Sequence, residues 1–189
     1  IEKGTVWKEV WEKDNRTVDV AQKAVEAGKA LTAPRTDWAE DPLKVATWNI
    51  QYLAKKPSWK EFRLPAIYAL LNDYEFDIFG SQEPYLPQIE DIMEGVSDKY
   101  AWVGECTGDK DSRQTHYNPI FYRKDRLELL ETGTVPYSET KGTIGFGAMY
   151  ARACTWAKFM DRKTGKIFYF FNSHFDHQGV EAREVSAEI

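Results

Sequence analysis

From Leu43 onward, short apolar runs alternate with amphipathic stretches, and this alternation predicts an α+β domain in which helices cover sheets. The strand-like runs are 43–49, 76–83, 100–105, 119–123, 127–133, 149–160 and 167–174. The helical patterns are 64–74, 87–96 and 180–189. A sheet-based domain portion is therefore predicted for residues 43–189.

The start of the first helix in this portion has two interpretations. Ser58 and Glu61 have the spacing of a capping box, which favours a start at Ser58. Pro65 is tolerated in a first helical turn but not in a helix interior, which favours a start near Leu64. We favour the second interpretation, with a helix from Leu64 to Tyr74.

Residues 1–42 differ from the rest of the chain. The stretch 17–31 is alanine-rich with spaced apolar positions, which predicts a short helix, and 32–42 is a polar connector with two prolines. We interpret 1–42 as an N-terminal extension or linker. Because the sequence begins with Ile1 and not with Met, an upstream signal peptide is one expectation, and with it a secreted or periplasmic location. No apolar run is long enough to cross a membrane, so a soluble protein is expected.

Charge and cysteine usage narrow the classes of partner. The formal net charge is -5, which disfavours nucleic acid as a partner because duplex binding requires a basic face. A small phosphorylated substrate bridged by a metal ion is compatible, since the metal brings positive charge. Cys106 and Cys154 are too few and too far apart for a structural zinc site. Two ordinary thiols are favoured over a disulfide.

Three of the apolar runs end on a side chain that binds phosphate or metal: Asn49, Glu83 and His174. Rigid strands that deliver polar side chains to one edge of a sheet build a preorganised site. A hard cation such as Mg²⁺ needs only one or two carboxylates in addition to water and substrate phosphate. Glu83 suits that ligand role, Asn49 can orient a phosphate or a ligand carboxylate, and His174 can donate a hydrogen bond to a phosphate oxygen.

Each of these residues also has an ordinary interpretation. A single asparagine at a strand end is usually a turn former, and Glu83 before Pro84 can cap the next helix. His174 can be an ordinary loop histidine. The order of the three residues, each following a strand, favours the functional interpretation over these.

Five segments resemble one known superfamily. They are 47-TWNI-50, 77-DIFGSQE-83, 118-NPIFY-122, 152-RACTWAKF-159 and 172-NSHFDHQGVEAR-183. The sequence from Leu43 to Ile189 is similar to the endonuclease/exonuclease/phosphatase superfamily of deoxyribonuclease-like, metal-dependent phosphohydrolases, and most of all to its bacterial branch. The resemblance implies two packed β-sheets with helices on the outer faces, a four-layer α/β/β/α sandwich.

The resemblance also implies roles for individual residues. Glu83 matches the metal-binding glutamate, and His174 matches the histidine that contacts the scissile phosphate. Asn49 matches the asparagine that helps to hold the metal-bound phosphate, so it is assigned to both the metal and the catalytic set. Asp176 lies in the matching segment and joins the catalytic set. The implied substrate-binding residues are Asn118, Arg152, His177 and Arg183.

The sequence departs from the family pattern in several places. The G-D-x-N and S-D-H motifs, which in relatives supply the water-activating aspartate and an Asp-His pair, are absent. We therefore expect the C-terminal half of the domain to be missing from this chain and supplied by the same or another polypeptide, with sheet edges and apolar faces left exposed. His116 stands where similar sequences carry an acidic residue. An alternative for Arg152 is an ion pair with a surface acid.

The function implied by the resemblance is hydrolysis of a phosphoester by water, with Mg²⁺ or Mn²⁺ as cofactor. A small-molecule or lipid-linked phosphoester is the expected substrate, and a nuclease is disfavoured by the charge. The alternative is a non-catalytic binding or structural domain, because two motifs are absent. Tyr52, Trp59 and Tyr85 can stack on a base or a sugar ring, although a core or interface role is favoured for them.

Overall fold

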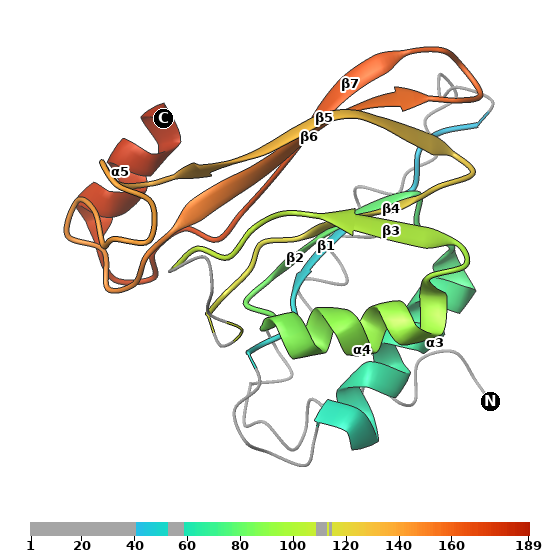
Figure 1. Ribbon diagram of the computed structural model, residues 1–189, viewed down its shortest axis with the longest axis horizontal. Helices are drawn as coiled ribbons and strands as arrows, with labels where there is room; N and C mark the ends of the chain where they lie inside the picture. The colour runs from blue at the N-terminus through green and yellow to red at the C-terminus, as the bar shows by residue number, and fades with distance from the viewer. Residues whose placement is uncertain (1–40, 53–58, 109–112, 114) are drawn as a thin grey trace, which may run out of the picture. The chain divides into compact units, whose positions relative to one another are not determined.

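Two β-sheets form the frame of the unit Leu43–Ile189 in the computed structural model of this protein (Figure 1). The structure describes residues 41–52, 59–108, 113 and 115–189. The predicted helix at 17–31, the connector up to residue 40 and Ser58 lie outside these residues. No helix within the described ranges is long and apolar enough to cross a membrane.

The first sheet has four strands in the order β1-β2-β4-β3. These strands are β1 (Val45–Asn49), β2 (Ile78–Gln82), β3 (Tyr100–Val103) and β4 (Ile120–Arg123). β1 and β2 run parallel, whereas β4 is antiparallel to both of its neighbours. Because β1 and β2 run in the same direction, their C-terminal ends lie at the same edge of the sheet.

The second sheet has three antiparallel strands in the order β5-β6-β7. They are β5 (Leu127–Pro136), β6 (Ala153–Asp161) and β7 (Ile167–Ser173). β6 begins later than the predicted 149–160, because the Met149 backbone N–H donates to the Asp176 carboxylate, 3.0 Å away, and leaves the strand ladder. This departure brings the residues before β6 into the loops at the end of the sheet.

The helices confirm the predicted α+β class. They are α3 (Leu64–Tyr74), α4 (Leu86–Val96) and α5 (Val180–Glu188), with a π-helical turn, η1 (Trp59–Arg63), before α3. α3 starts at Leu64 with Pro65 in its first turn, as favoured from the sequence. Figure 1 shows α3 and α4 on one face of the four-stranded sheet, opposite the second sheet, and α5 at the end of the second sheet.

Two apolar clusters hold these layers together. The cluster between the four-stranded sheet and its helices is centred on Phe79 and Phe121, whose stacked rings lie 4.6 Å apart. The cluster between the two sheets includes Ile120 and Phe159, which are fully buried. Burial of such side chains removes apolar area from water and stabilises the fold. Among the described residues Cys106 and Cys154 form no disulfide, as predicted.

A buried asparagine in β7 joins the two sheets by hydrogen bonds. The Asn172 amide nitrogen donates to the carbonyl oxygens of Ser81 and Pro119, each 2.8 Å away, and its oxygen accepts from the Gln82 amide at 2.6 Å. A Cβ at Gly80 would lie 2.6 Å from the Asn172 side chain, so only glycine allows this approach. The end of β7 is thereby fixed against the end of β2.

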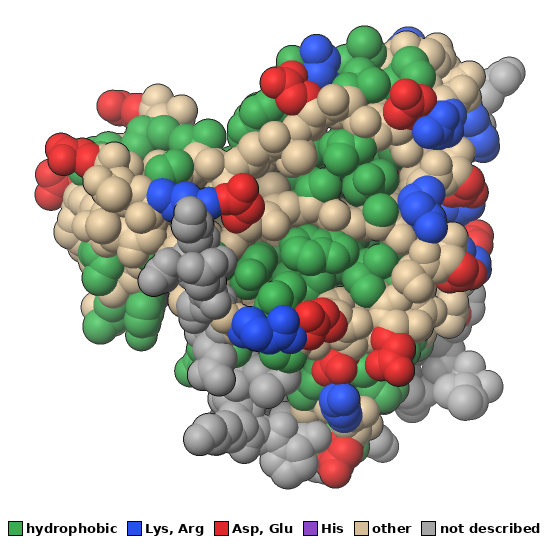
Figure 2. Space-filling model, in the orientation of Figure 1, with side chains coloured by type: hydrophobic (Ala, Val, Ile, Leu, Met, Phe, Trp, Pro, Cys, Tyr) green, Lys and Arg blue, Asp and Glu red, His purple; other side chains and the backbone are tan. Residues whose placement is uncertain are grey.

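The outward face of the three-stranded sheet is partly uncovered. Ile167, Tyr169 and Phe171 alternate along β7 and are 56%, 51% and 65% exposed. β7 is also an edge strand of its sheet among the described residues. Figure 2 shows hydrophobic side chains among charged ones over this part of the molecule. Exposed sheet edges and apolar faces of this kind were expected from the sequence.

A buried ion pair fixes the start of β5 to the turn between β6 and β7. The Arg126 guanidinium donates to both oxygens of Asp161, at 2.9 and 3.1 Å, and the Lys163 N–H and Thr164 hydroxyl donate to the same carboxylate. Burial raises the pKa of Asp161, but the bonds from Arg126 and the turn outweigh it and bring that pKa to about 2. The carboxylate is therefore charged and fully hydrogen-bonded in the fold.

We expect Asp161→Asn to lower the free energy of unfolding by about 3 kcal/mol at neutral pH, because it leaves a buried guanidinium uncompensated. Asp125→Asn is the matched control, since Asp125 pairs with Arg123 at the surface and should cost about 1 kcal/mol or less. Denaturant unfolding measures both.

The pH dependence of the Asp161 effect has a defined sign. Folding lowers the pKa of Asp161 from 3.8 to about 2. The stabilisation that Asp161 contributes to the fold is therefore present at pH values above 3.8 and is lost as the pH falls toward about 2. A difference between wild type and Asp161→Asn that stays constant over this window would contradict the assignment.

Candidate active site

The parallel pairing of β1 and β2 places Glu83 beside Asn49. Asn49 lies opposite Gln82 in the register, and Glu83 follows directly. The Asn49 amide nitrogen donates to Oε1 of Glu83 at 2.7 Å, and the Tyr52 backbone N–H donates to Oε2 at 3.3 Å. The Glu83 carboxylate is thus held at the edge of the sheet by one donor on each oxygen.

The backbone turns sharply where these two strands end. Glu83 has φ +71° and Gln51 has φ +61°, both in the left-handed region that non-glycine residues rarely adopt. The Asn49 side-chain oxygen accepts from the Gln51 N–H at 2.8 Å, which supports the turn after β1. Such conformations cost of order 1 kcal/mol each and gather at functional sites. They direct the Glu83 carboxylate toward Asn49.

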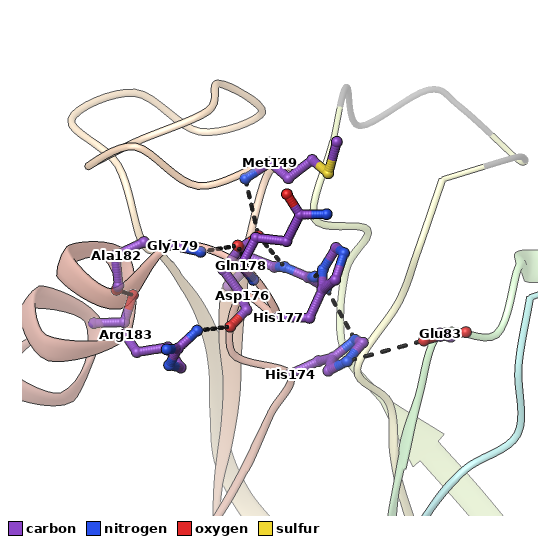
Figure 3. Close-up of polar contacts among 12 residues, drawn as sticks. Glu83, Met149, His174, Asp176, His177, Gln178, Gly179, Ala182 and Arg183 are labelled. Carbon is purple, nitrogen blue, oxygen red and sulfur yellow. Dashed lines mark hydrogen bonds and ion pairs between the residues drawn. The ribbon is translucent and has the colours of Figure 1, made fainter.

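His174, which follows β7, meets Glu83 across the two sheets (Figure 3). Its Nε2 lies 3.9 Å from Oε1 of Glu83. Burial lowers the pKa of His174, the Arg152 charge lowers it further, and Glu83 opposes both. The imidazole is therefore neutral at neutral pH, and its approach to Glu83 is not an ion pair.

A single buried arginine joins His174 to the loop that follows it. Arg152 donates to Nδ1 of His174 at 2.9 Å and to Nδ1 of His177 at 3.4 Å. Its Nε donates to Oδ2 of Asp176 at 3.4 Å. Because a guanidinium only donates hydrogen bonds, both Nδ1 atoms act as acceptors, and the proton on each ring lies on Nε2.

The Asp176 carboxylate organises the loop between β7 and α5. It accepts from the backbone N–H groups of Met149, Gln178 and Gly179 at 3.0, 3.0 and 2.8 Å (Figure 3). Burial raises the pKa of Asp176, but these bonds and the Arg152 charge outweigh it and hold that pKa well below its usual range. Since the side chain is almost fully buried, its contacts are with the protein and not with solvent.

The remaining predicted site residues, Arg183 and Asn118, contact the backbone beside Asp176 and Arg152. Arg183 on α5 donates to the backbone oxygen of Asp176 at 3.0 Å. Asn118 is buried, and its amide nitrogen donates to the Ala153 backbone oxygen at 2.8 Å, while its side-chain oxygen has no hydrogen-bond partner in the described part of the chain. The structure thus links Asn49, Glu83, His174, Arg152 and His177 through direct contacts, and places Asp176, Arg183 and Asn118 in support of them.

Sequence reasoning missed two contributions to this group. The Tyr52 N–H donates to Glu83, and no sequence pattern marks a backbone donor in a loop. Tyr150 lies beside Arg152, whose guanidinium carbon is 5.7 Å from the centre of its ring. The sequence predicted Tyr150 to lie in the strand 149–160. It lies in the loop before β6, because the Met149 backbone N–H donates to Asp176 and not to a neighbouring strand.

The Glu83 carboxylate fits a hard divalent cation. Within the described ranges no group of three or more His, Cys, Asp or Glu side chains is placed to hold a metal ion. Mg²⁺ does not require such a cage, because it keeps several waters and uses one or two carboxylates with substrate phosphate. Each Glu83 oxygen accepts one hydrogen bond from the described residues and retains a further lone pair for such an ion.

Comparison with known proteins identifies several structures of similar fold. No protein-family model matches the chain, and no curated protein matches it. An endonuclease/exonuclease/phosphatase from Bacteroides vulgatus is 36% identical, with a TM-score of 0.69 over 77% of this chain and 57% of its own. A mannosyl-6-phosphatase from Bacteroides thetaiotaomicron is 34% identical, with a TM-score of 0.71 over 78% of this chain and 57% of its own.

More distant structures share the fold alone. The human nocturnin catalytic domain, solved with a bound sulfate anion, is 17% identical, with a TM-score of 0.56 over 69% of this chain and 48% of its own. The chain spans 57% of the length of the two Bacteroides structures.

We expect His174 and His177 both to be in the Nε2–H tautomer, because Arg152 donates to each Nδ1. Long-range ¹H–¹⁵N spectra at about pH 8, where histidines are neutral, distinguish the two tautomers. In Arg152→Gln we expect His174 to become a mixture of tautomers. Arg113→Gln is the control, since Arg113 pairs with Glu90 at the surface. An Nδ1–H tautomer of His174 in the wild type would contradict the geometry.

Proposed function

Because this chain belongs to the endonuclease/exonuclease/phosphatase family, we propose that the protein containing it hydrolyses a phosphoester bond with the aid of a divalent metal ion. One observation carries the proposal: Asn49, Glu83 and His174, from two different sheets, lie in contact at one edge of the fold. The Glu83 carboxylate can act as a metal ligand, and the neutral His174 imidazole beside it can donate a hydrogen bond. This pair of groups suits a phosphate that is bridged by a metal ion.

The proposed cofactor is Mg²⁺ or Mn²⁺. Glu83 would hold the ion, and Asn49 would orient the Glu83 carboxylate, since its amide nitrogen already donates to Oε1. A bound ion of this kind polarises a phosphate oxygen and stabilises the charge that develops on the leaving oxygen.

His174 and Arg152 supply the hydrogen-bond donors of the proposed site. With Nδ1 occupied by Arg152, the Nε2–H of His174 is free to donate to a phosphate oxygen as negative charge develops there. Arg152 itself is held by Asp176, which is in turn held by three backbone N–H groups. Asp176 is therefore proposed as a positioning residue, and not as a group that contacts the substrate.

The reaction is the attack of water on phosphorus. A bond forms between the water oxygen and phosphorus, the bond from phosphorus to the alcohol oxygen breaks, and the alcohol leaves with a proton. The family resemblance assigns the base that takes the proton of water to the G-D-x-N aspartate, which this sequence does not contain. We therefore propose that catalysis requires the part of the domain that relatives carry beyond the matched region.

The proposed substrate is a small or lipid-linked phosphoester. The net charge of -5 opposes a polynucleotide, whose phosphates require neutralisation by lysine and arginine. One similar structure is described as a mannosyl-6-phosphatase, which makes a sugar phosphate the first substrate to test. A secreted or periplasmic location remains a prediction from the sequence. The competing function is a binding domain on the same scaffold.

We expect Glu83→Gln to lower metal-dependent kcat/KM by about 10², because it removes the charged ligand and leaves the shape of the site unchanged. The measurement is hydrolysis of p-nitrophenyl phosphate and bis-p-nitrophenyl phosphate by the full-length protein with Mg²⁺. Glu131→Gln, at an exposed position of β5, is the control. A Glu83→Gln variant with the wild-type rate would remove Glu83 from the site, and an inactive wild type would favour the binding domain.

We expect His174→Ala to lower kcat by about 10² with the fold preserved, because the variant loses a donor to the transition state. Circular dichroism and thermal unfolding check the fold. If the variant loses activity only because it unfolds, His174 is a structural residue and the proposed donor role is wrong.

A further inference from the structure

Five aromatic rings from five loops lie at the edge of the fold that carries Glu83 and His174. We call them the aromatic rim: Tyr52 after β1, Tyr85 after β2, His116 before β4, Tyr150 before β6 and His177 after β7. Successive ring centres in the rim are 5.4 to 6.2 Å apart, which makes it a continuous aromatic surface.

Two tyrosines of this surface are open to solvent. Tyr52 is 41% exposed and Tyr150 is 50% exposed. By contrast, Trp59 is buried, and its indole N–H donates to Asp91 at 2.8 Å. Of the three aromatic residues singled out in the sequence, Trp59 therefore belongs to the core, whereas Tyr52 and Tyr85 belong to the rim.

Both exposed tyrosines are tied to the groups that would bind phosphate. The Tyr52 backbone donates to the Glu83 carboxylate, so its ring is fixed close to the proposed metal ligand. The Tyr150 ring lies against the guanidinium of Arg152, which donates to His174. A phosphate held between Glu83 and His174 would therefore have its alcohol group beside the rim.

The shape of the rim suits a sugar better than a base. The Tyr52 ring is tilted by 31° from Tyr85 and by 38° from His116, and His116 is tilted by 54° from Tyr150. Tyr150 and His177 are stacked at 20°, so the rim is a curved wall that ends in one stacked pair. Aromatic faces pack against apolar faces of ligands, while phenol and imidazole groups offer hydrogen bonds at their edges. A sugar ring presents an apolar C–H face bordered by hydroxyl groups, and this combination matches the rim.

We propose that the aromatic rim is a binding subsite for the ring of a sugar phosphate, and that Tyr52 and Tyr150 determine specificity for ring-bearing substrates. The inference rests on the proposed phosphoester hydrolysis at the same site. It assigns the rim to the alcohol part of the substrate, whereas Glu83 and His174 act on the phosphate.

The test compares three phosphate monoesters with the full-length protein and Mg²⁺: glucose 6-phosphate, adenosine 5′-monophosphate and glycerol 3-phosphate, which has no ring. We expect Tyr52→Leu and Tyr150→Leu each to raise KM for glucose 6-phosphate about tenfold, within the range for loss of ring stacking on an aromatic side chain. The ratio of KM for glucose 6-phosphate to KM for glycerol 3-phosphate should rise by about the same factor. Tyr169→Leu, an exposed tyrosine on the outward face of β7, should change neither.

Three results would overturn the proposal. An equal loss with glycerol 3-phosphate would show that the tyrosines support the site and do not bind a ring. An unchanged KM for glucose 6-phosphate would exclude contact with the sugar. A rise in KM confined to adenosine 5′-monophosphate would assign the rim to a base.

Failure of the proposed hydrolysis can be told apart from failure of this inference. If the wild type hydrolyses none of the three esters, the proposed function fails, and calorimetric binding with Mg²⁺ tests the rim directly. Tighter binding of glucose 6-phosphate than of glycerol 3-phosphate, lost in Tyr52→Leu, would support the subsite. Equal binding of the two esters would overturn it.

Discussion

The hydrogen bonds of Asn172 across the two sheets hold together the strand ends that carry Glu83 and His174. The side chain is buried and joins β7 to the backbone of Ser81 and Pro119. Ser81 lies two residues before Glu83, and Asn172 lies two residues before His174. A buried amide with its hydrogen bonds made is specific in geometry, because any shift of one sheet leaves a polar group unpaired. The separation of Glu83 and His174 is thus set by the packing of the sheets and not by the loops that carry them.

The charged groups of the site form a chain of contacts that starts at the backbone. Three backbone N–H groups hold Asp176 as a carboxylate, Asp176 holds Arg152, and Arg152 sets the hydrogen-bond role of His174. A buried guanidinium needs such a partner, since an uncompensated charge in the interior is costly. The result is a neutral imidazole with its donor directed to the same edge as the Glu83 carboxylate. This arrangement is the basis of the proposed binding of a phosphate and a divalent ion.

Much of this arrangement could be predicted from the sequence, because strand ends are marked by a change from apolar to polar residues. The meeting of Asn49, Glu83 and His174 followed from that pattern, and helix α3 was predicted to the residue from Pro65. The contacts of Arg152 could not be predicted. Its partner Asp176 lies 24 residues further along the chain, and the two side chains meet only because of the register between β6 and β7. For the same reason the burial of Asp176 was not expected. Among the rim residues, the family resemblance implied substrate binding for His177, whereas a core or interface role was favoured for Tyr52 and Tyr85. Tyr150 was not singled out, because it reaches the rim through the loop before β6.

The most direct test of the account is the location of Mn²⁺ in crystals of the full-length protein, by anomalous scattering. Mn²⁺ has the same preference for oxygen ligands as Mg²⁺ and is visible by this method. The account predicts an ion in contact with the Glu83 carboxylate, on the side that faces His174. An ion bound at a site without Glu83, or no bound ion at millimolar Mn²⁺, would contradict the account.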